Sequence, residues 1–229
     1  MLKMENQQGV RILVLDRPPV NALTLESLIA LRRAMEDAAG DSDCLGVVVT
    51  GANACFSGGI DVKALPSYTR EQSEAAVLEI TRLVVAGYAL DKPLVAALSG
   101  HTIGAGMILA LMADWRVVAR GNFRMGLTEA AAGLPFPLGA LEIVRAELPP
   151  DLARRLAIGS ATHPIDAPMF VNVIDATVDA ADLLPAALAE VRRLVAMPGF
   201  ALVKAQYRRD TRTRLAAMAT GRDPLLDMI

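Results

Sequence analysis

Apolar and polar positions along the chain change repeatedly between two spacings, which predicts strands followed by helices. Short apolar runs rich in β-branched residues are typical of buried strands, and they cover residues 10–15, 45–50, 94–98, 115–119 and 171–178. Apolar residues at helical spacing predict helices over 24–40, 72–90, 138–148, 150–158, 182–197 and 199–218. Strands that alternate with helices favour an α/β fold with crossover connections.

Residues 93–114 join an apolar strand to an apolar helix through small residues. The strand Leu94–Leu98 ends at Ser99-Gly100, and the helix that ends near Asp114 begins around Gly104-Ala105-Gly106. Small residues let other groups approach the backbone closely, and the first N–H groups of a helix have no partner within it. Such N–H groups favour a negatively charged oxygen.

A second glycine-containing loop, residues 51–63, has Gly58-Gly59 at its centre and also lies between a strand and a helix. Ordinary strand-to-helix turns are an equally good interpretation of both loops. Neither loop has the GxGxxG pattern with a following acidic residue, and GxxxxGK[ST] is absent, so a nucleotide-binding fold is not favoured.

Composition narrows the class of protein. The chain has 229 residues, 53% hydrophobic and 21% charged, with a formal net charge of −2, which suits one substantial core or a core with a small appendage. The sequence has no stripe of basic residues, so nucleic acid is not expected as a partner. The two cysteines are expected to be free thiols, and neither a secretory signal nor an apolar run of membrane-spanning length is visible. We therefore expect a cytoplasmic protein that does not enter membranes, and the high apolar share suits self-association.

Glu129 is the one carboxylate in a segment that otherwise holds Met, Gly, Leu, Thr and Ala. An acidic residue in the first turn of a helix is often only a favourable partner of the helix dipole, so two interpretations are open for it. His101 and His163 have no metal-like spacing to other ligands, and no GxSxG motif is present. We expect neither a metal site nor a Ser-His hydrolase.

Three ordered motifs resemble the crotonase superfamily, the enoyl-CoA hydratase/isomerase group. They are Phe56-Ser57-Gly58-Gly59-Ile60-Asp61, then Ala97-Leu98-Ser99-Gly100 with Gly104-Ala105-Gly106, then Met125-Gly126-Leu127-Thr128-Glu129 with Gly133. The resemblance runs from about residue 10 to 178. It implies a spiral of ββα units over residues 1–180 and a helical trimerisation region over 181–229, assembled as trimers or as hexamers built from two trimers.

The resemblance also implies an acyl-CoA substrate, with coenzyme A as part of the substrate and no separate cofactor. The thioester oxygen would bind between the backbone N–H groups of Ile60 and Ala105, and Glu129 would act as acid/base. Substrate-binding positions carried over from the family are Ser57, Gly58, Gly59, Lys63, Gly104, Gly106 and Ile108. Lys63 is placed where members often carry a cation near the CoA phosphates.

One departure from the pattern of the family limits the reactions that we expect. Hydratases of the crotonase superfamily carry two glutamates in the active site. In this sequence, Ile108 stands at the position of the first glutamate. Moving a double bond needs one base, whereas adding water uses two carboxylates. We therefore expect a Δ3-Δ2-enoyl-CoA isomerase. The alternatives are a hydratase or another crotonase reaction, such as decarboxylation or thioester hydrolysis, and a non-catalytic acyl-CoA-binding subunit. Apolar neighbours Ile108 and Leu127 would raise the pKa of Glu129 and a helix N-terminus would lower it, so its direction stays open.

Overall fold

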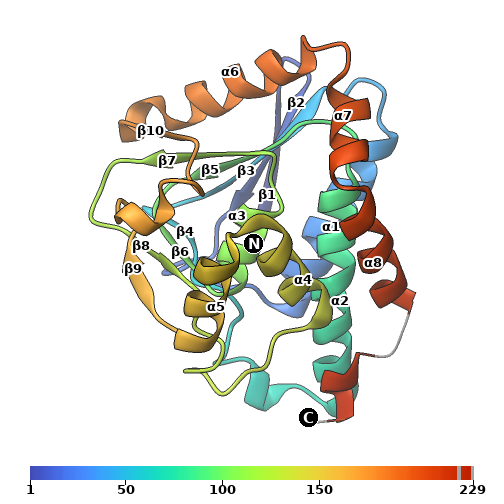
Figure 1. Cartoon of the computed structure of the whole chain (residues 1–229), viewed down its shortest axis with the longest axis vertical. Coiled ribbons are helices and arrows are strands. Elements are labelled where there is room, and N and C mark those ends of the chain that lie inside the picture. Colours follow the sequence, from blue (N-terminus) through green and yellow to red (C-terminus); the bar gives the residue numbers. More distant parts are fainter. Residues whose placement is uncertain (221–222, 228–229) are drawn as a thin grey trace.

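Two sheets of unequal size form the centre of the fold in the computed structural model, which describes residues 1–220 and 223–227 (Figure 1). The larger sheet has six strands in the order β1-β2-β3-β5-β7-β10, all parallel except for the antiparallel pair β1 and β2. Its strands are β1 (Leu2–Gln7), β2 (Val10–Leu15), β3 (Gly46–Gly51), β5 (Leu94–Leu98), β7 (Trp115–Ala119) and β10 (Ala176–Val178).

The smaller sheet has four short strands in the order β4-β6-β8-β9, the last pair antiparallel. These strands are β4 (Cys55–Ser57), β6 (His101–Ile103), β8 (Arg124–Gly126) and β9 (Thr162–Pro164). The large-sheet strands β3, β5 and β7 are each followed by a small-sheet strand and then by a helix. This repeat confirms the predicted α/β spiral of ββα units.

Eight α-helices and four short 3-10 segments complete the described residues. The α-helices are α1 (Leu25–Gly40), α2 (Arg70–Ala89), α3 (Ala105–Leu111), α4 (Leu138–Glu147), α5 (Pro150–Gly159), α6 (Leu183–Val195), α7 (Phe200–Tyr207) and α8 (Arg209–Thr220). The 3-10 segments are η1 (Leu65–Ser67), η2 (Pro168–Phe170), η3 (Ala180–Asp182) and η4 (Pro224–Asp227).

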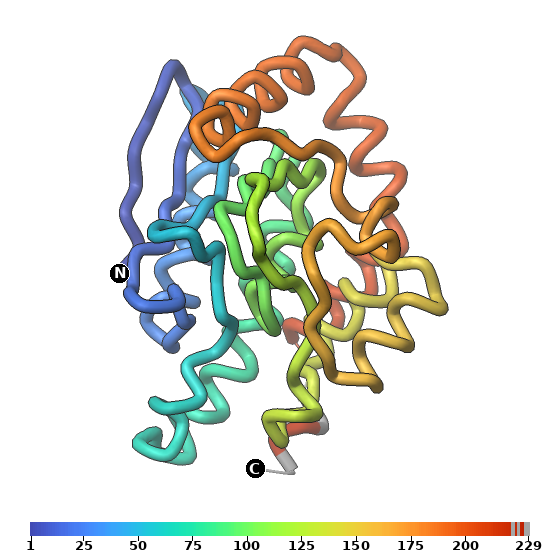
Figure 2. Tube along the Cα trace, turned by 90° about the vertical axis from the view of Figure 1, so that its left-hand side faces the viewer, coloured from blue at the N-terminus to red at the C-terminus, as the bar shows by residue number. Residues whose placement is uncertain are grey.

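The central strands of the larger sheet, β2, β3, β5 and β7, are buried on both faces, which explains their mostly apolar runs. Leu13, Val47 and Val49 belong to the main core together with α1 to α4, whereas alternate residues such as Ile12 and Val48 pack with α6. Figure 2 shows α6, in orange, crossing the top of the molecule. The predicted cap of α1 is also confirmed, because Thr24 accepts a hydrogen bond from the Ser27 N–H.

Two predicted elements were wrong in extent. The predicted strand over 171–178 is reduced to β10, because the N–H groups of Val173 and Ile174 both donate to the Phe170 carbonyl and form a turn. An apolar residue stands at position 173 because this position is buried in the core, although it is not part of a strand. The predicted helix over 199–218 is two helices, α7 and α8, separated at Arg208.

Three short strands, β4, β6 and β9, and the edge strand β1 have no counterpart among the predicted elements. The first three are only three residues long, and β1 is almost fully exposed. Neither case produces the apolar run on which sequence prediction of strands depends.

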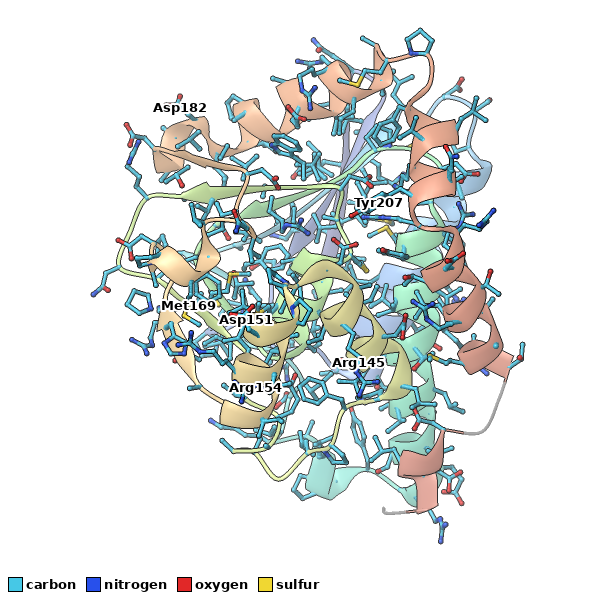
Figure 3. The ribbon with its side chains drawn as sticks, in the orientation of Figure 1. Arg145, Asp151, Arg154, Met169, Asp182 and Tyr207 are labelled. Atoms are coloured by element: carbon cyan, nitrogen blue, oxygen red, sulfur yellow. The ribbon has the colours of Figure 1, made fainter. Side chains whose placement is uncertain are left out.

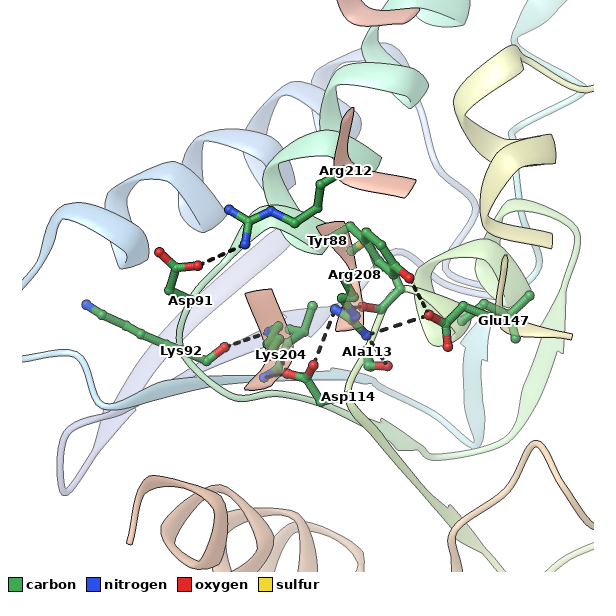
Figure 4. Close-up of polar contacts among 12 residues, drawn as sticks. Tyr88, Asp91, Lys92, Ala113, Asp114, Glu147, Lys204, Arg208 and Arg212 are labelled. Carbon is green, nitrogen blue, oxygen red and sulfur yellow. Dashed lines mark hydrogen bonds and ion pairs between the residues drawn. The ribbon is translucent and has the colours of Figure 1, made fainter. Parts of the chain in front are cut away.

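The helices α7 and α8 are fastened to the main core by buried charges (Figure 4). Asp114 accepts hydrogen bonds from Lys204 Nζ at 2.7 Å and from the Leu94 N–H at 2.8 Å. Arg208 donates to the carbonyls of Met112 and Ala113 just after α3, and its guanidinium lies 3.9 Å from the centre of the Tyr88 ring. These contacts hold the end of α7 against the segment after α3, and they give Asp114 a structural role.

Candidate functional site

A cavity of about 280 Å³ lies between α1, α2, α3 and α4. Its walls are almost entirely apolar, and the polar side chains among the described lining residues are Glu129, Tyr68 and Ser73. A largely apolar cavity with a few placed polar groups is the usual form of a small-molecule site. We therefore take this cavity as the candidate active site.

Four residues singled out by sequence meet in this cavity, although they come from different parts of the chain. Ile60 follows β4, Ala105 and Ile108 lie on the first two turns of α3, and Glu129 follows β8. Within residues 1–220 and 223–227, the N–H groups of Ile60 and Ala105 donate no hydrogen bond to another protein group. Both N–H groups are therefore available to an oxygen in the cavity.

Two glycines explain how the loops carrying these N–H groups come together. Gly59 has φ of +88°, and a Cβ there would lie 2.9 Å from the Ile103 carbonyl oxygen and 3.1 Å from the Ala105 nitrogen. Gly104 has φ of +56°, and a Cβ there would lie 3.6 Å from Oε1 of Glu129. L side chains rarely adopt this backbone conformation, so both positions favour glycine for conformation, and Gly59 favours it for space as well.

The other predicted substrate-binding residues hold the two loops rather than line the cavity. The Ser57 hydroxyl donates to the Asn21 carbonyl at 2.9 Å and accepts from the Gly59 N–H at 3.1 Å. The Gly58 N–H donates to the Val20 carbonyl at 2.7 Å, and Gly106 packs closely against Ser57. Lys63 is exposed and lies outside the cavity lining, so its contact with CoA stays a prediction.

Burial determines the electrostatics of Glu129. Its Oε2 atom is buried and has no hydrogen-bond partner among the described residues. Burial raises the pKa of Glu129 above its usual range, and the backbone N–H groups of Glu129 and Thr128 oppose this effect without overcoming it. No helix begins here, because residues 129–133 form hydrogen-bonded turns. The sequence left open whether the pKa of Glu129 is raised or lowered, and in the structure it is raised.

Sequence reasoning missed most of the other lining residues, among them Tyr68, Ser73 and Leu225. Tyr68 follows η1, and its hydroxyl oxygen accepts a hydrogen bond from the Leu25 N–H at 3.1 Å. Leu225 lies in η4, far along the chain from the motifs. No spacing rule connects these positions to the glycine loops. Ser73 lies on α2, and η4 reaches the cavity by packing against α2.

The described residues contain no group of three His, Cys, Asp or Glu side chains arranged to hold a metal ion. No described helix is long and apolar enough to cross a membrane. Cys44 and Cys55 are free thiols, as expected, and both are buried.

Comparison with known proteins finds relatives over most of the chain. EchA17 of Mycobacterium tuberculosis strain H37Rv, a probable enoyl-CoA hydratase, is 33% identical over 199 residues, which are 86% of this chain and 76% of that protein. The 2,3-dehydroadipyl-CoA hydratase of Escherichia coli strain K12 is 38% identical over 148 residues, 63% of this chain and 56% of that protein.

A solved structure shares the fold over nearly the whole chain. The human mitochondrial delta3-delta2-enoyl-CoA isomerase superposes with a TM-score of 0.88 at 24% identity, covering 99% of this chain and 91% of that chain. The sequence pattern of the family described as enoyl-CoA hydratase/isomerase matches residues 5–228. The chain therefore belongs to the enoyl-CoA hydratase/isomerase family, whose members act on acyl-CoA thioesters.

Proposed function

We propose that this protein is a Δ3-Δ2-enoyl-CoA isomerase in which Glu129 is the single acid/base. The observation that carries the proposal is the pairing of one carboxylate, Glu129, with an apolar side chain, Ile108, in the same cavity. Ile108 is buried and cannot hold or split water. A single carboxylate suffices to take a proton from C2 of a 3-enoyl thioester and return one to C4.

The raised pKa of Glu129 suits both halves of this reaction. A carboxylate with a pKa above its usual range is a stronger base toward C2, and the resulting carboxylic acid is ready to protonate C4. Because Oε2 has no partner among the described residues, no other protein group competes with the substrate for the proton. The proton that Glu129 receives stays in a mostly apolar cavity until it is returned.

Removal of the C2 proton places negative charge on the thioester oxygen. We assign the N–H groups of Ile60 and Ala105 as the donors that stabilise this enolate. Each such donor contributes on the order of 3 kcal/mol in a transition state. The reaction so described needs no cofactor beyond the coenzyme A that the substrate carries.

A panel of 3-enoyl- and 2-enoyl-CoA substrates tests the proposal through the absorbance of the conjugated thioester. We expect the absorbance to rise with 3-enoyl-CoA and to stay constant with 2-enoyl-CoA. Hydration of 2-enoyl-CoA without isomerisation would refute the proposal. Tight binding of both thioesters without turnover would instead identify a non-catalytic acyl-CoA-binding subunit.

A hydratase is the second candidate, and the names of relatives favour it. Both EchA17 of M. tuberculosis and the E. coli protein described above are named hydratases. For this chain to add water, some group other than residue 108 would have to hold it. Tyr68 and Ser73 carry the other hydroxyl groups of the described lining, so Tyr68→Phe and Ser73→Ala would abolish hydration if it occurred.

We also propose that the chain assembles as a homotrimer or homohexamer. The support is the apolar surface of α7, where Leu202, Val203 and Tyr207 are exposed; Tyr207, labelled in Figure 3, is 84% exposed. Exposed apolar side chains gathered on one helix are typical of an interface. Light scattering coupled to gel filtration measures the assembly: a mass of three or six chains is expected, and a monomer would contradict the proposal.

A further inference from the structure

The polar groups of the cavity wall that the proposed reaction uses lie together, and the rest of the wall is mostly apolar. Glu129, Ile60 and Ala105 provide the polar groups that the proposed reaction uses. Elsewhere the wall is made of aliphatic side chains, with the hydroxyls of Tyr68 and Ser73 as exceptions. Among the described lining residues there is no Lys, Arg or His.

The lining residues differ in their exposure to solvent. Leu65, Tyr68 and Pro135 are partly or fully exposed, whereas Leu28, Ile80 and Ala140 are buried. Leu225 belongs with the buried group, at 6% exposed. Leu225 therefore belongs to the part of the cavity wall that is closed to solvent.

Leu225 is held in place by an anchor in its own segment. The buried carboxylate of Asp223 accepts hydrogen bonds from the Leu138 N–H at 2.9 Å and from the Leu225 N–H at 3.0 Å. Leu138 is the first residue of α4, where a carboxylate interacts favourably with the helix dipole. The C-terminal segment 223–227 is thus fastened to α4 with Leu225 turned into the cavity; Figures 1 and 2 both show it at the end of the molecule that holds η1.

From this arrangement we propose that the site accepts an uncharged aliphatic acyl chain and that Leu225 limits the length of that chain. The inference rests on the proposed function, because it assumes that the cavity holds the acyl group. It assigns Leu225 as a specificity-determining residue and Asp223 as the residue that positions it.

The apolar lining of the cavity also disfavours a charged group on the acyl tail. A carboxylate at the far end of the acyl chain would enter aliphatic surroundings that offer it no cation among the described residues, and Glu129 in the same cavity would repel it. This separates the present chain from the relative named for dehydroadipyl-CoA, whose acyl group carries such a carboxylate. The selectivity of that relative therefore does not transfer to this site.

Binding of saturated acyl-CoAs to the full chain, measured by calorimetry, tests the inference without requiring turnover. We expect the Kd to fall about fourfold for each added methylene until the cavity is filled, and then to rise. Hexanoyl-CoA should bind at least 100-fold more tightly than adipyl-CoA, which has the same number of carbons. Equal binding of these two thioesters would overturn the inference on charge, and failure of every acyl-CoA to bind would overturn the proposed function as well.

Variants of the C-terminal segment test the role of Leu225. Leu225→Ala should move the tightest-binding chain to a greater length, with about a fourfold gain for each methylene newly accommodated, and Leu225→Phe should move it to a shorter one. Leu226→Ala is the matched control, because Leu226 is equally buried but does not line the cavity. An unchanged length optimum in both Leu225 variants, with cooperative unfolding retained, would refute the assignment.

Discussion

Replacing Glu129 with glutamine separates its role in the reaction from its role in the fold. Glutamine keeps the shape of the side chain but can neither accept the C2 proton nor return one to C4. A positioned general base contributes about 10²- to 10⁴-fold in rate, equal to roughly 3–5 kcal/mol of activation free energy. The N–H groups of Ile60 and Ala105 are untouched, so we expect the loss to appear in kcat and not in acyl-CoA binding.

The same substitution has an opposite effect on stability. Because burial raises the pKa of Glu129, the folded chain holds this proton more tightly than the unfolded chain does. Ionisation in the folded protein therefore costs stability as the pH rises above the unfolded pKa of about 4.3, and the cost is complete above the folded pKa. Glu129→Gln removes the cost, so at pH 8 the variant should be at least as stable as the wild type. The difference should shrink toward pH 4.

Two measurements on the Glu129→Gln variant test its effects on the rate and on the stability. Rates come from the absorbance of the conjugated thioester formed from 3-enoyl-CoA, and free energies of unfolding come from denaturant titrations at pH 8 and pH 4. Glu36→Gln, on the exposed surface of α1, is the control and should change neither quantity by much. Activity within tenfold of the wild type would refute Glu129 as the base. A clear loss of stability at pH 8 would show that its carboxylate has a stabilising partner.

Three further substitutions test other parts of the structure. Ile108→Glu should raise the pKa of Glu129 further through like-charge repulsion, move the acid limb of the isomerase pH profile upward and introduce hydration of 2-enoyl-CoA; an unchanged profile would show that the two side chains do not face the same space. Gly59→Ala should lower kcat by about 10²- to 10³-fold by displacing the oxyanion turn, whereas Gly9→Ala, which also has a positive φ but lies in the β1–β2 turn, should affect only the melting temperature. Arg208→Met should cost about 3–5 kcal/mol of unfolding free energy, because buried Asp114 loses an ion-pair partner and the carbonyls of Met112 and Ala113 lose a donor. Arg209→Met, whose ion pair with Asp210 is exposed, should stay within about 0.5 kcal/mol.

The main helices and the long strands could be predicted because their patterns reflect burial directly. Leu28, Leu31 and Met35 recur at helical spacing because one face of α1 packs in the core. The runs over β3 and β5 are uninterrupted because helices cover both faces of their sheet. Thr24 could be recognised as a helix cap because its hydroxyl acts within one turn of the chain. All of these signals are local.

The features that the sequence did not predict depend on contacts between distant residues. β4 and β6 are too short to show a period, and they exist because they pair with each other. Leu225 looks like any C-terminal leucine until Asp223 bonds to Leu138 and places it at the cavity. The candidate site was found in advance because its glycines and Glu129 form motifs, whereas Tyr68 belongs to none.

The central claim is that one carboxylate carries a proton from C2 to C4 of the acyl chain. Following a 3-enoyl-CoA deuterated at C2 tests it most directly, with the position of the label in the product read by NMR. A single glutamate in a mostly apolar cavity should deliver part of the deuterium to C4 of the 2-enoyl product. Product with hydrogen from solvent alone at C4, or formation of 3-hydroxyacyl-CoA in its place, would contradict the account.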